Sequence, residues 1–128
     1  MATEFIPPKV ESPFRILFLG AATMGWSMAS DEERRQTILP RLLEVCASWA
    51  DMGARLITTL DDDLFMVGQP SSTAFSWYFV YEVDRLDTVA AMIQSFRVSK
   101  DGARLDKWFR LEARICRPFF PIEGAGQP

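Results

Sequence analysis

The sequence predicts an α+β domain in which one face of a four-stranded antiparallel sheet carries both long helices. The chain has 128 residues, enough for one domain with its own hydrophobic core. Apolar runs of strand length and two amphipathic segments follow one another in the order β-α-β-β-α-β. The last run, residues 107–117, strictly alternates apolar with mostly charged side chains, as a strand with two different faces does.

The chain is expected to start with an arm and a short buried strand. Residues 1–12 contain prolines and scattered charges and predict a flexible N-terminal arm, followed by a single domain at 13–120. Residues 14–19 are apolar except for Arg15 and predict the first strand. Residues 21–29 follow neither period and predict a loop, and the Pro- and Gly-rich residues 121–128 predict a C-terminal tail.

The first helix is predicted by its cap and its apolar stripe. Ser30 and Glu33 form a capping box, which predicts that the helix begins there. Pro40 predicts a kink, or two helical pieces that meet at that point, because an interior proline lacks the backbone N–H, and Gly53 predicts the C-terminal end. The apolar stripe consists of Ile38, Leu42, Val45, Cys46, Trp49 and Met52.

The second half of the chain predicts three strands and one helix. Residues 54–67 predict one long strand, bent at the acidic triplet 61–63, and the aromatic-rich residues 73–83 predict the next strand. Asp84 is expected to cap the second helix, and residues 107–117 form the final strand.

This order of elements is the ferredoxin-like arrangement, whose two helices can cover only one face of the sheet. The first strand is apolar on both faces, with Phe14, Ile16 and Phe18 on one side. Leu17 and Leu19 lie on the other. Because a large exposed apolar sheet face marks an interaction surface, the sequence predicts a homodimer in which two sheets close face to face.

Composition excludes several functional classes. The chain has no histidine, which removes Ser-His and Cys-His nucleophile systems, histidine-ligated haem and nearly all zinc sites. A net charge of −3 argues against nucleic acid, and no apolar run is long enough for a membrane helix. Cys46 and Cys116 predict buried thiols, while Asp61 and Asp63 are too few ligands for a metal. We expect a cytoplasmic protein with no metal and no cofactor.

Three segments carry a resemblance to a known group of proteins: 76–83 (Ser-Trp-Tyr-Phe-Val-Tyr-Glu-Val), Phe96-Arg97 and 108–114 (Trp-Phe-Arg-Leu-Glu-Ala-Arg). With the element order, they make residues 13–120 similar to the dimeric α+β barrel superfamily. Within it, the chain looks most like the small proteins associated with bacterial indole-3-acetate breakdown. The superfamily includes cofactor-free monooxygenases, isomerases, cyclases, haem proteins and non-catalytic members, so the fold does not choose a function. The lack of histidine argues against the haem-binding activities.

The charged face of the last strand is the first candidate site. Arg110, Glu112 and Arg114 share this face, which would line the barrel if the apolar face packs on the helices. The two arginines would hold a ligand carboxylate or enolate, and Glu112 would act as general acid or base. The alternative is an internal ion-pair ladder that fixes sheet register or dimer geometry.

Aromatic residues supply the second set of candidates. Tyr78 is a second proton carrier, because a polar tip on an inward face needs a partner or a substrate. The candidate walls of an aromatic-ligand pocket are Trp26, Trp77, Tyr81 and Trp108. The alternative for these four residues is plain core or interface.

The expected function is that of a cytoplasmic homodimer that binds a small aromatic metabolite. If it is an enzyme, its chemistry is cofactor-independent, and oxygenation, isomerisation or cyclisation would each fit. The alternatives are a non-catalytic accessory or binding protein of a catabolic or biosynthetic pathway, and a purely structural dimer.

Overall fold

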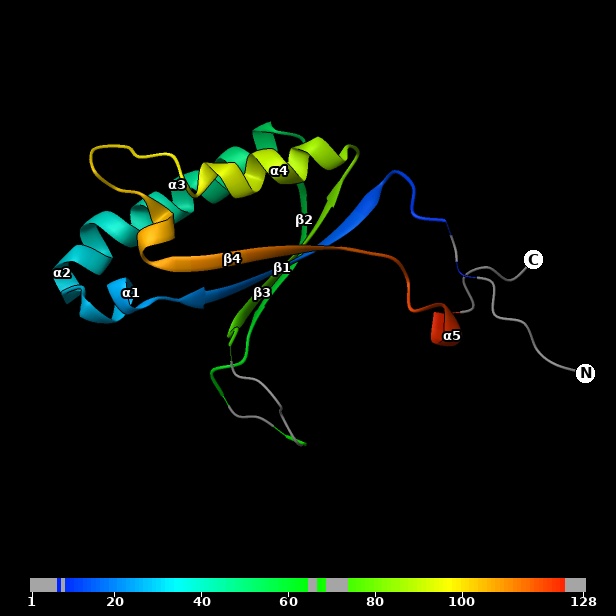
Figure 1. Ribbon diagram of the computed structural model, residues 1–128, viewed down its shortest axis with the longest axis horizontal. Coiled ribbons are helices and arrows are strands. Elements are labelled where there is room, and N and C mark those ends of the chain that lie inside the picture. The colour runs from blue at the N-terminus through cyan, green and yellow to red at the C-terminus, as the bar shows by residue number, and fades with distance from the viewer. Residues whose placement is uncertain (1–6, 8, 65–66, 69–73, 124–128) are drawn as a thin grey trace, which may run out of the picture.

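The structure is a computed structural model that describes residue 7 and residues 9–64, 67–68 and 74–123. It confirms the predicted fold class, because the major elements follow the β-α-β-β-α-β order and form an antiparallel sheet with the strand order β2-β3-β1-β4. Both long helices lie on one face of this sheet (Figure 1). The fold is therefore α+β and ferredoxin-like.

The four strands are arranged around the first one. Their bounds are Phe14–Ala22 for β1, Arg55–Asp61 for β2, Trp77–Val83 for β3 and Phe109–Cys116 for β4. Strand β1 pairs with β3 on one side and with β4 on the other, so it is the inner strand that joins them. It runs past Gly20 because its pairing with β4 continues through Ala22 and Phe109.

The first helical region is more divided than the sequence predicts. It comprises α1 (Met24–Met28), α2 (Asp31–Glu33), a π-helical turn η1 (Arg34–Ile38) and α3 (Leu39–Asp51). The predicted loop at 21–29 is thus partly helical, and Ser30 is confirmed as the N-cap by a 3.0 Å hydrogen bond from the Glu33 N–H to Ser30 Oγ, which is one half of the predicted capping box.

A π-turn stands directly before the proline that was expected to cause a kink. Pro40 is the second residue of α3, and the Leu39 N–H bonds to the Arg34 carbonyl five residues back. Since Pro40 has no N–H to donate, the wider turn before it places the proline in the first turn of α3, where a donor is not needed. The helical path therefore continues through this position.

The C-terminal end of α3 is as predicted. Gly53 adopts a φ of 96°, a left-handed conformation that glycine reaches without strain. The Ala54 N–H bonds to the Trp49 carbonyl at 3.0 Å, and the Gly53 N–H bonds to the Ala50 carbonyl at 3.1 Å. This pair of bonds is a Schellman motif, which turns the chain directly into β2.

Strand β2 is shorter than predicted. It ends at Asp61, its irregularity lies between Leu56 and Thr58 and not at the acidic triplet, and Leu64 and Val67 are outside any strand. Residues 65–66 of the predicted strand, and residue 73 at the predicted start of β3, lie outside the described residues.

Helix α4 (Leu86–Ser95) begins one residue later than its predicted cap allows. Arg85 occupies the capping position, and the Asp84 carboxylate instead accepts a 2.9 Å hydrogen bond from Arg55 Nη2. A guanidinium competes for this carboxylate, so it does not cap the helix.

Strand β4 also starts later than predicted, because a short 3-10 helix, η2 (Leu105–Lys107), precedes it. The Trp108 N–H bonds to the Leu105 carbonyl at 3.0 Å, and the Trp108 side chain is buried in the core. Trp108 therefore belongs to the 3-10 turn and not to the charged strand face. A last short helix, α5 (Phe120–Glu123), lies beyond the end of β4 (Figure 1).

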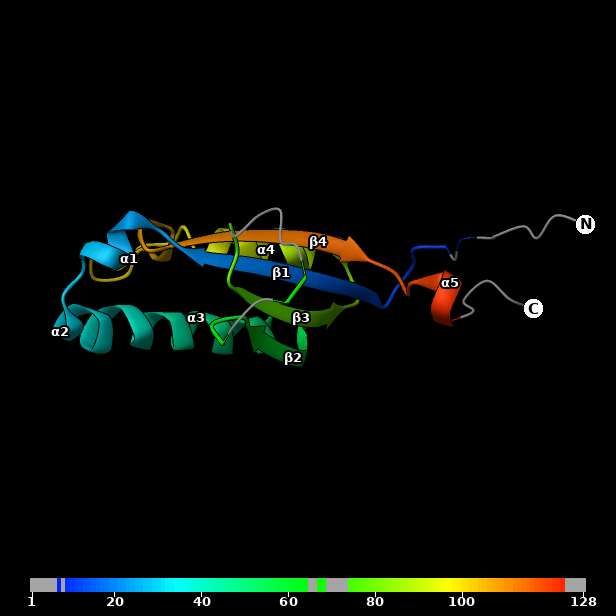
Figure 2. The ribbon, with the colours of Figure 1, turned by 90° about the horizontal axis from the view of Figure 1, so that it is seen from below.

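The core fills the space between the sheet and the helices. Trp49 of α3 is fully buried, its ring centroid lies 5.2 Å from that of Phe18, and its Nε1 donates to Ser95 Oγ at 2.8 Å. Seen from below, β1 and β4 lie in front of α4 (Figure 2). In the described part of the chain no helix is long and apolar enough to cross a bilayer.

Candidate functional site

The sheet face that α3 and α4 leave uncovered is called the open face below. Pairing register places its side chains in three rows that cross the sheet from β2 to β4. The rows are Leu60, Tyr78, Leu19 and Glu112, then Thr58, Val80, Leu17 and Arg114, then Arg55, Glu82, Arg15 and Cys116. The middle of the face is therefore aliphatic, and its β4 edge and one end are charged.

The predicted charged residues of β4 lie together on this face. Arg110 Nη2 is 3.6 Å from Glu112 Oε1, and Arg114 Nη2 is 4.0 Å from Glu112 Oε2. All three side chains are about half exposed, with 48% of Glu112 accessible. Ion pairs with such long N–O distances and such exposed side chains contribute little to stability. Both arginines therefore remain available to another carboxylate. The Arg110 guanidinium also lies 5.1 Å from the centroid of the Phe75 ring.

The two predicted proton carriers share one row but do not touch. Tyr78 and Glu112 both pair with Leu19, from opposite sides, which places their backbones about 10 Å apart across the sheet. The Tyr78 hydroxyl donates a 2.7 Å hydrogen bond to Asp62 Oδ2, and this bond raises the tyrosine pKa. Tyr78 therefore has a partner of its own and stays protonated at neutral pH.

The four predicted aromatic wall residues lie on the helix side of the sheet, away from the charged residues of β4. Trp77 packs on Phe79 with centroids 4.7 Å apart, and Trp26 packs on Phe109 at 5.4 Å. Tyr81 and Trp108 are buried members of the same core. In the isolated chain, these four residues therefore occupy core positions, as the alternative prediction for them stated.

Burial raises the pKa of two core groups, the Tyr81 hydroxyl and the Cys46 thiol. Desolvation raises the pKa of Tyr81 to about 12, with a smaller contribution from Cys46. Loss of water also raises the pKa of the Cys46 thiol to about 11. Neither group is ionised near pH 7, so both act as apolar packing groups there.

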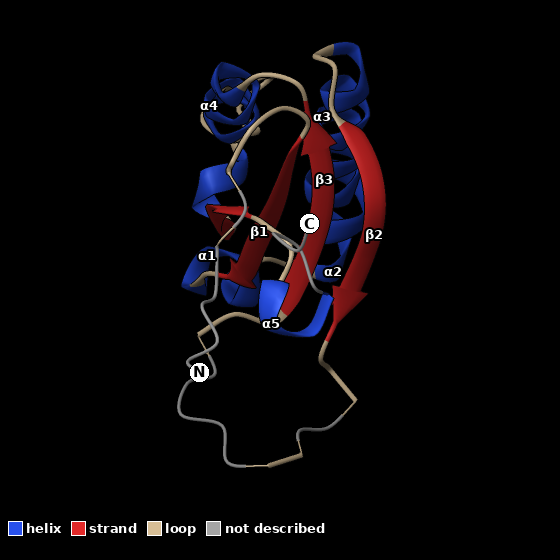
Figure 3. Cartoon of the chain, turned by 90° about the vertical axis from the view of Figure 1, so that its right-hand side faces the viewer, coloured by secondary structure: helices blue, strands red, loops and turns tan. Residues whose placement is uncertain are grey.

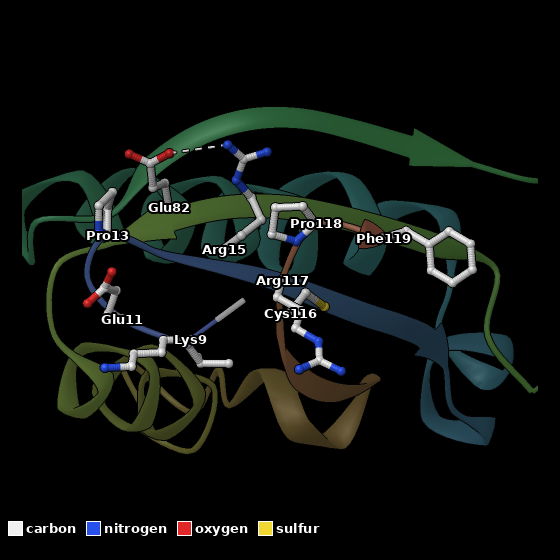
Figure 4. Close-up of a pocket in the computed structure, with 10 residues that line it drawn as sticks. Lys9, Glu11, Pro13, Arg15, Glu82, Cys116, Arg117, Pro118 and Phe119 are labelled. Atoms are coloured by element: carbon white, nitrogen blue, oxygen red, sulfur yellow. Dashed lines mark hydrogen bonds and ion pairs between the residues drawn. The ribbon is translucent and has the colours of Figure 1, made fainter. Parts of the chain in front are cut away.

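A groove of about 380 Å³ lies at the end of the open face where β1 begins and β4 ends (Figure 4). Residues from the open face line it together with the segments that enter β1 and leave β4. Its charged lining residues are Lys9, Glu11, Arg15, Glu82 and Arg117. Its other lining residues are Val10, Pro13, Cys116, Pro118 and Phe119.

Sequence reasoning missed this groove because its walls come from opposite ends of the chain. They meet only because β1 and β4 are antiparallel neighbours, with Arg15 opposite Cys116. A usable signal was present, since Lys9 and Glu11 precede the first strand and Arg117 follows the last one. Because β1 and β4 are antiparallel neighbours in this fold, those two segments lie at the same end of the sheet.

The charges at this end of the sheet are unequally paired. Glu82 accepts hydrogen bonds from Arg55 at 3.0 Å and from Arg15 at 3.3 Å. These bonds, the Arg55 one foremost, lower the pKa of Glu82. Arg117 stacks on the Phe120 ring, with 5.3 Å from the guanidinium carbon to the ring centroid. Within the described part of the chain, Arg117 and Lys9 have no carboxylate partner.

The described residues contain no group of three or more carboxylates or thiols that would hold a metal ion. The chain matches no protein-family model, no curated protein and no solved structure in the comparisons. Function must therefore be argued from the open face and its groove.

Proposed function

We propose that the protein is a cytoplasmic homodimer that binds a small, acidic aromatic metabolite between the open faces of two sheets. The observation that carries this proposal is the sheet face opposite α3 and α4, where Leu17 and Val80 are partly exposed and Arg110, Glu112 and Arg114 form the border on β4. A second copy of this face would bury both features and form a dimeric α+β barrel.

Closure of the barrel would strengthen the charge interactions among Arg110, Glu112 and Arg114 of β4. In the isolated chain the Glu112 pairs are solvent-screened, but under a second sheet the local dielectric falls and charge interactions strengthen. Buried charges must then be satisfied, and two guanidinium groups around one carboxylate leave cationic capacity for a ligand carboxylate. This is why Arg110 and Arg114 are assigned to ligand binding.

Aromatic contacts to the ligand would come from the open face. Phe75 lies beside Arg110, and Tyr78 lies in the same row as Glu112. An arginine stacked on an aromatic ring presents both a charge and an apolar plane, which suits an aryl carboxylate. The resemblance to proteins associated with indole-3-acetate breakdown favours an indolic compound.

If the protein is an enzyme, the open face divides the proton chemistry between two residues. Glu112, which is half exposed, would take the proton, and Tyr78 would donate its hydroxyl hydrogen to developing negative charge after releasing its hydrogen bond to Asp62. Oxygenation, isomerisation and cyclisation all fit this equipment. The second candidate is a non-catalytic binding or accessory protein. The long N–O distances and the solvent exposure of Arg110, Glu112 and Arg114 are compatible with that role as well.

Thermal-shift titration with aromatic acids, indole-3-acetate among them, tests the binding site. We expect the ligand to raise the Tm of the wild type, and Arg114→Gln to weaken binding about tenfold because one charged hydrogen bond is lost. Arg104→Gln is the matched control, since Arg104 pairs with Asp106 away from the open face. Failure of every acid to stabilise the wild type, or an equal loss in the control, would contradict the site.

Glu112→Gln separates enzyme from accessory protein. The amide keeps the shape of the side chain but cannot take a proton, so a catalytic role predicts retained binding and lost turnover of a bound acid. An accessory role predicts no turnover in either form, with binding unchanged.

A further inference from the structure

We propose that the groove at the β1/β4 end of the open face is a second binding site, which takes a small monocarboxylate with an apolar body. Its arginine and lysine side chains are independent of the row around Glu112, so this site goes beyond the proposed barrel function. Four residue steps along β4 separate Glu112 from Cys116 in the groove, a distance of about 13 Å.

The charge balance of the groove calls for one negative charge. Lys9, Arg15 and Arg117 face Glu11 and Glu82, which leaves three cations against two anions. Glu82 is already shared by Arg15 and by Arg55, a cation that does not line the groove. Arg117 and Lys9 are the cations of the groove without a carboxylate partner in the described chain.

The presence of the two acids selects among anions. Glu11 and Glu82 would repel a dianion such as a phosphate monoester more strongly than a single carboxylate, and the Arg117 side chain extends away from Glu82 (Figure 4). The guanidinium of Arg117 is held by its stacking on Phe120, so its planar N–H fork is oriented before the ligand arrives. Pre-orientation lowers the entropy cost of binding.

The remaining walls fit an apolar body. Pro13 and Pro118 border the groove from two segments, Val10 is 51% exposed and Phe119 is 65% exposed. Exposed rings and aliphatic groups beside unpaired cations are the combination that an aryl or alkyl carboxylate would cover. The volume of about 380 Å³ is that of a site for a small ligand.

The test is an NMR titration of the ¹⁵N-labelled full chain with phenylacetate, with neutral phenylacetamide as the matched ligand. We expect phenylacetate to shift the amide signals of residues 9–12, 14–15, 116–117 and 119, since the two prolines between them have no N–H, and the amide ligand to bind at least about tenfold more weakly. Arg117→Gln should reduce phenylacetate affinity by a similar factor, while Arg117→Lys keeps part of it because the charge remains.

Two controls separate this site from the proposed barrel. Arg114→Gln, on the same strand but outside the groove, should leave the groove shifts unchanged, and so should Leu17→Asp, which removes the dimer that the barrel requires. Shifts confined to residues 110–114 would overturn the groove while supporting the barrel site. Equal binding of the acid and the amide, or no effect of Arg117→Gln, would also overturn it.

Discussion

At the scale of single residues, the two cysteines have different environments. The Cys46 thiol is largely desolvated by α3 and the sheet, and this burial raises its pKa to about 11. Cys116 lines the groove at the end of the open face, beyond its aliphatic middle, and is partly exposed. Both are free thiols, so their reactivity reports directly on the two sides of the sheet.

A thiol-exchange reagent at pH 8 should therefore label the native protein in two phases. Cys116 should react in the fast phase, and Cys46 at least about tenfold more slowly because its thiolate is scarce and covered. Absorbance of the released thiol follows both phases, and Cys116→Ser should remove only the fast one. A single phase for two equivalents in the native wild type would contradict the assigned burial.

At the scale of elements, the pairing of β1 with β3 depends on a missing side chain. Gly20 lies opposite Trp77, and a methyl group built at Gly20 would collide with the indole ring of Trp77. The absent Cβ lets the ring lie across β1 toward Phe109, 6.1 Å away between centroids. Gly20 is thus required for close approach and not for an unusual backbone angle.

Gly20→Ala should destabilise the protein by about 1 to 3 kcal/mol, because the ring must leave its site or the strands must separate. Chemical denaturation measures this change. In the background of Trp77→Leu, which removes the large ring, the cost of Gly20→Ala should be much smaller. An unchanged cost there would mean that Trp77 is not the obstacle.

At the scale of the whole molecule, all bulky packing is on one side. The four tryptophans, Trp26, Trp49, Trp77 and Trp108, belong to the core or pack against it, while the open face offers aliphatic and charged groups. Helix α3 accordingly lies behind β3 and β2, and β2 is an edge strand of the sheet (Figure 3). Oligomerisation through the open face would leave these tryptophans undisturbed.

The homodimer is tested by sedimentation at micromolar concentration. We expect a dimer for the wild type and a monomer for Leu17→Asp, because a carboxylate in the middle of the open face would be buried unpaired at the interface. Leu43→Asp is the matched control, since Leu43 is 70% exposed on α3 and should leave the dimer intact. Tryptophan emission should be the same in all three proteins. A monomeric wild type, or dissociation by Leu43→Asp, would contradict this interface.

Periodicity predicted the faces of β4 well and its start poorly. Phe109, Leu111 and Ala113 pack toward the helices and Arg110 lies on the open face, because a strand offers only two directions. Trp108 fits the same alternation, but the preceding 3-10 turn rotates it into the core. A pattern of period two cannot reveal where a neighbouring helical turn replaces the strand.

The groove and the missing cap at Asp84 depend on contacts between distant residues. Asp84 has the sequence features of a cap, but pairing of β2 with β3 brings Arg55 to it. The groove likewise exists only after β1 and β4 become neighbours. Local sequence predicts which elements form, whereas these features follow from which elements meet.

The inner position of β1 also constrains how this protein is made. Of the four strands, β1 leaves the ribosome first, yet its partners are distant in the chain. Leu19 pairs with Tyr78 and with Glu112, and Glu112 comes 93 residues after Leu19 in the sequence. Until β3 and β4 have been synthesised, the apolar strand β1 has no strand to pair with. Unpaired apolar strands bind chaperones or associate with incorrect partners. We therefore expect the nascent chain to acquire its native sheet only after residue 116 has left the exit tunnel, in a late and largely concerted step.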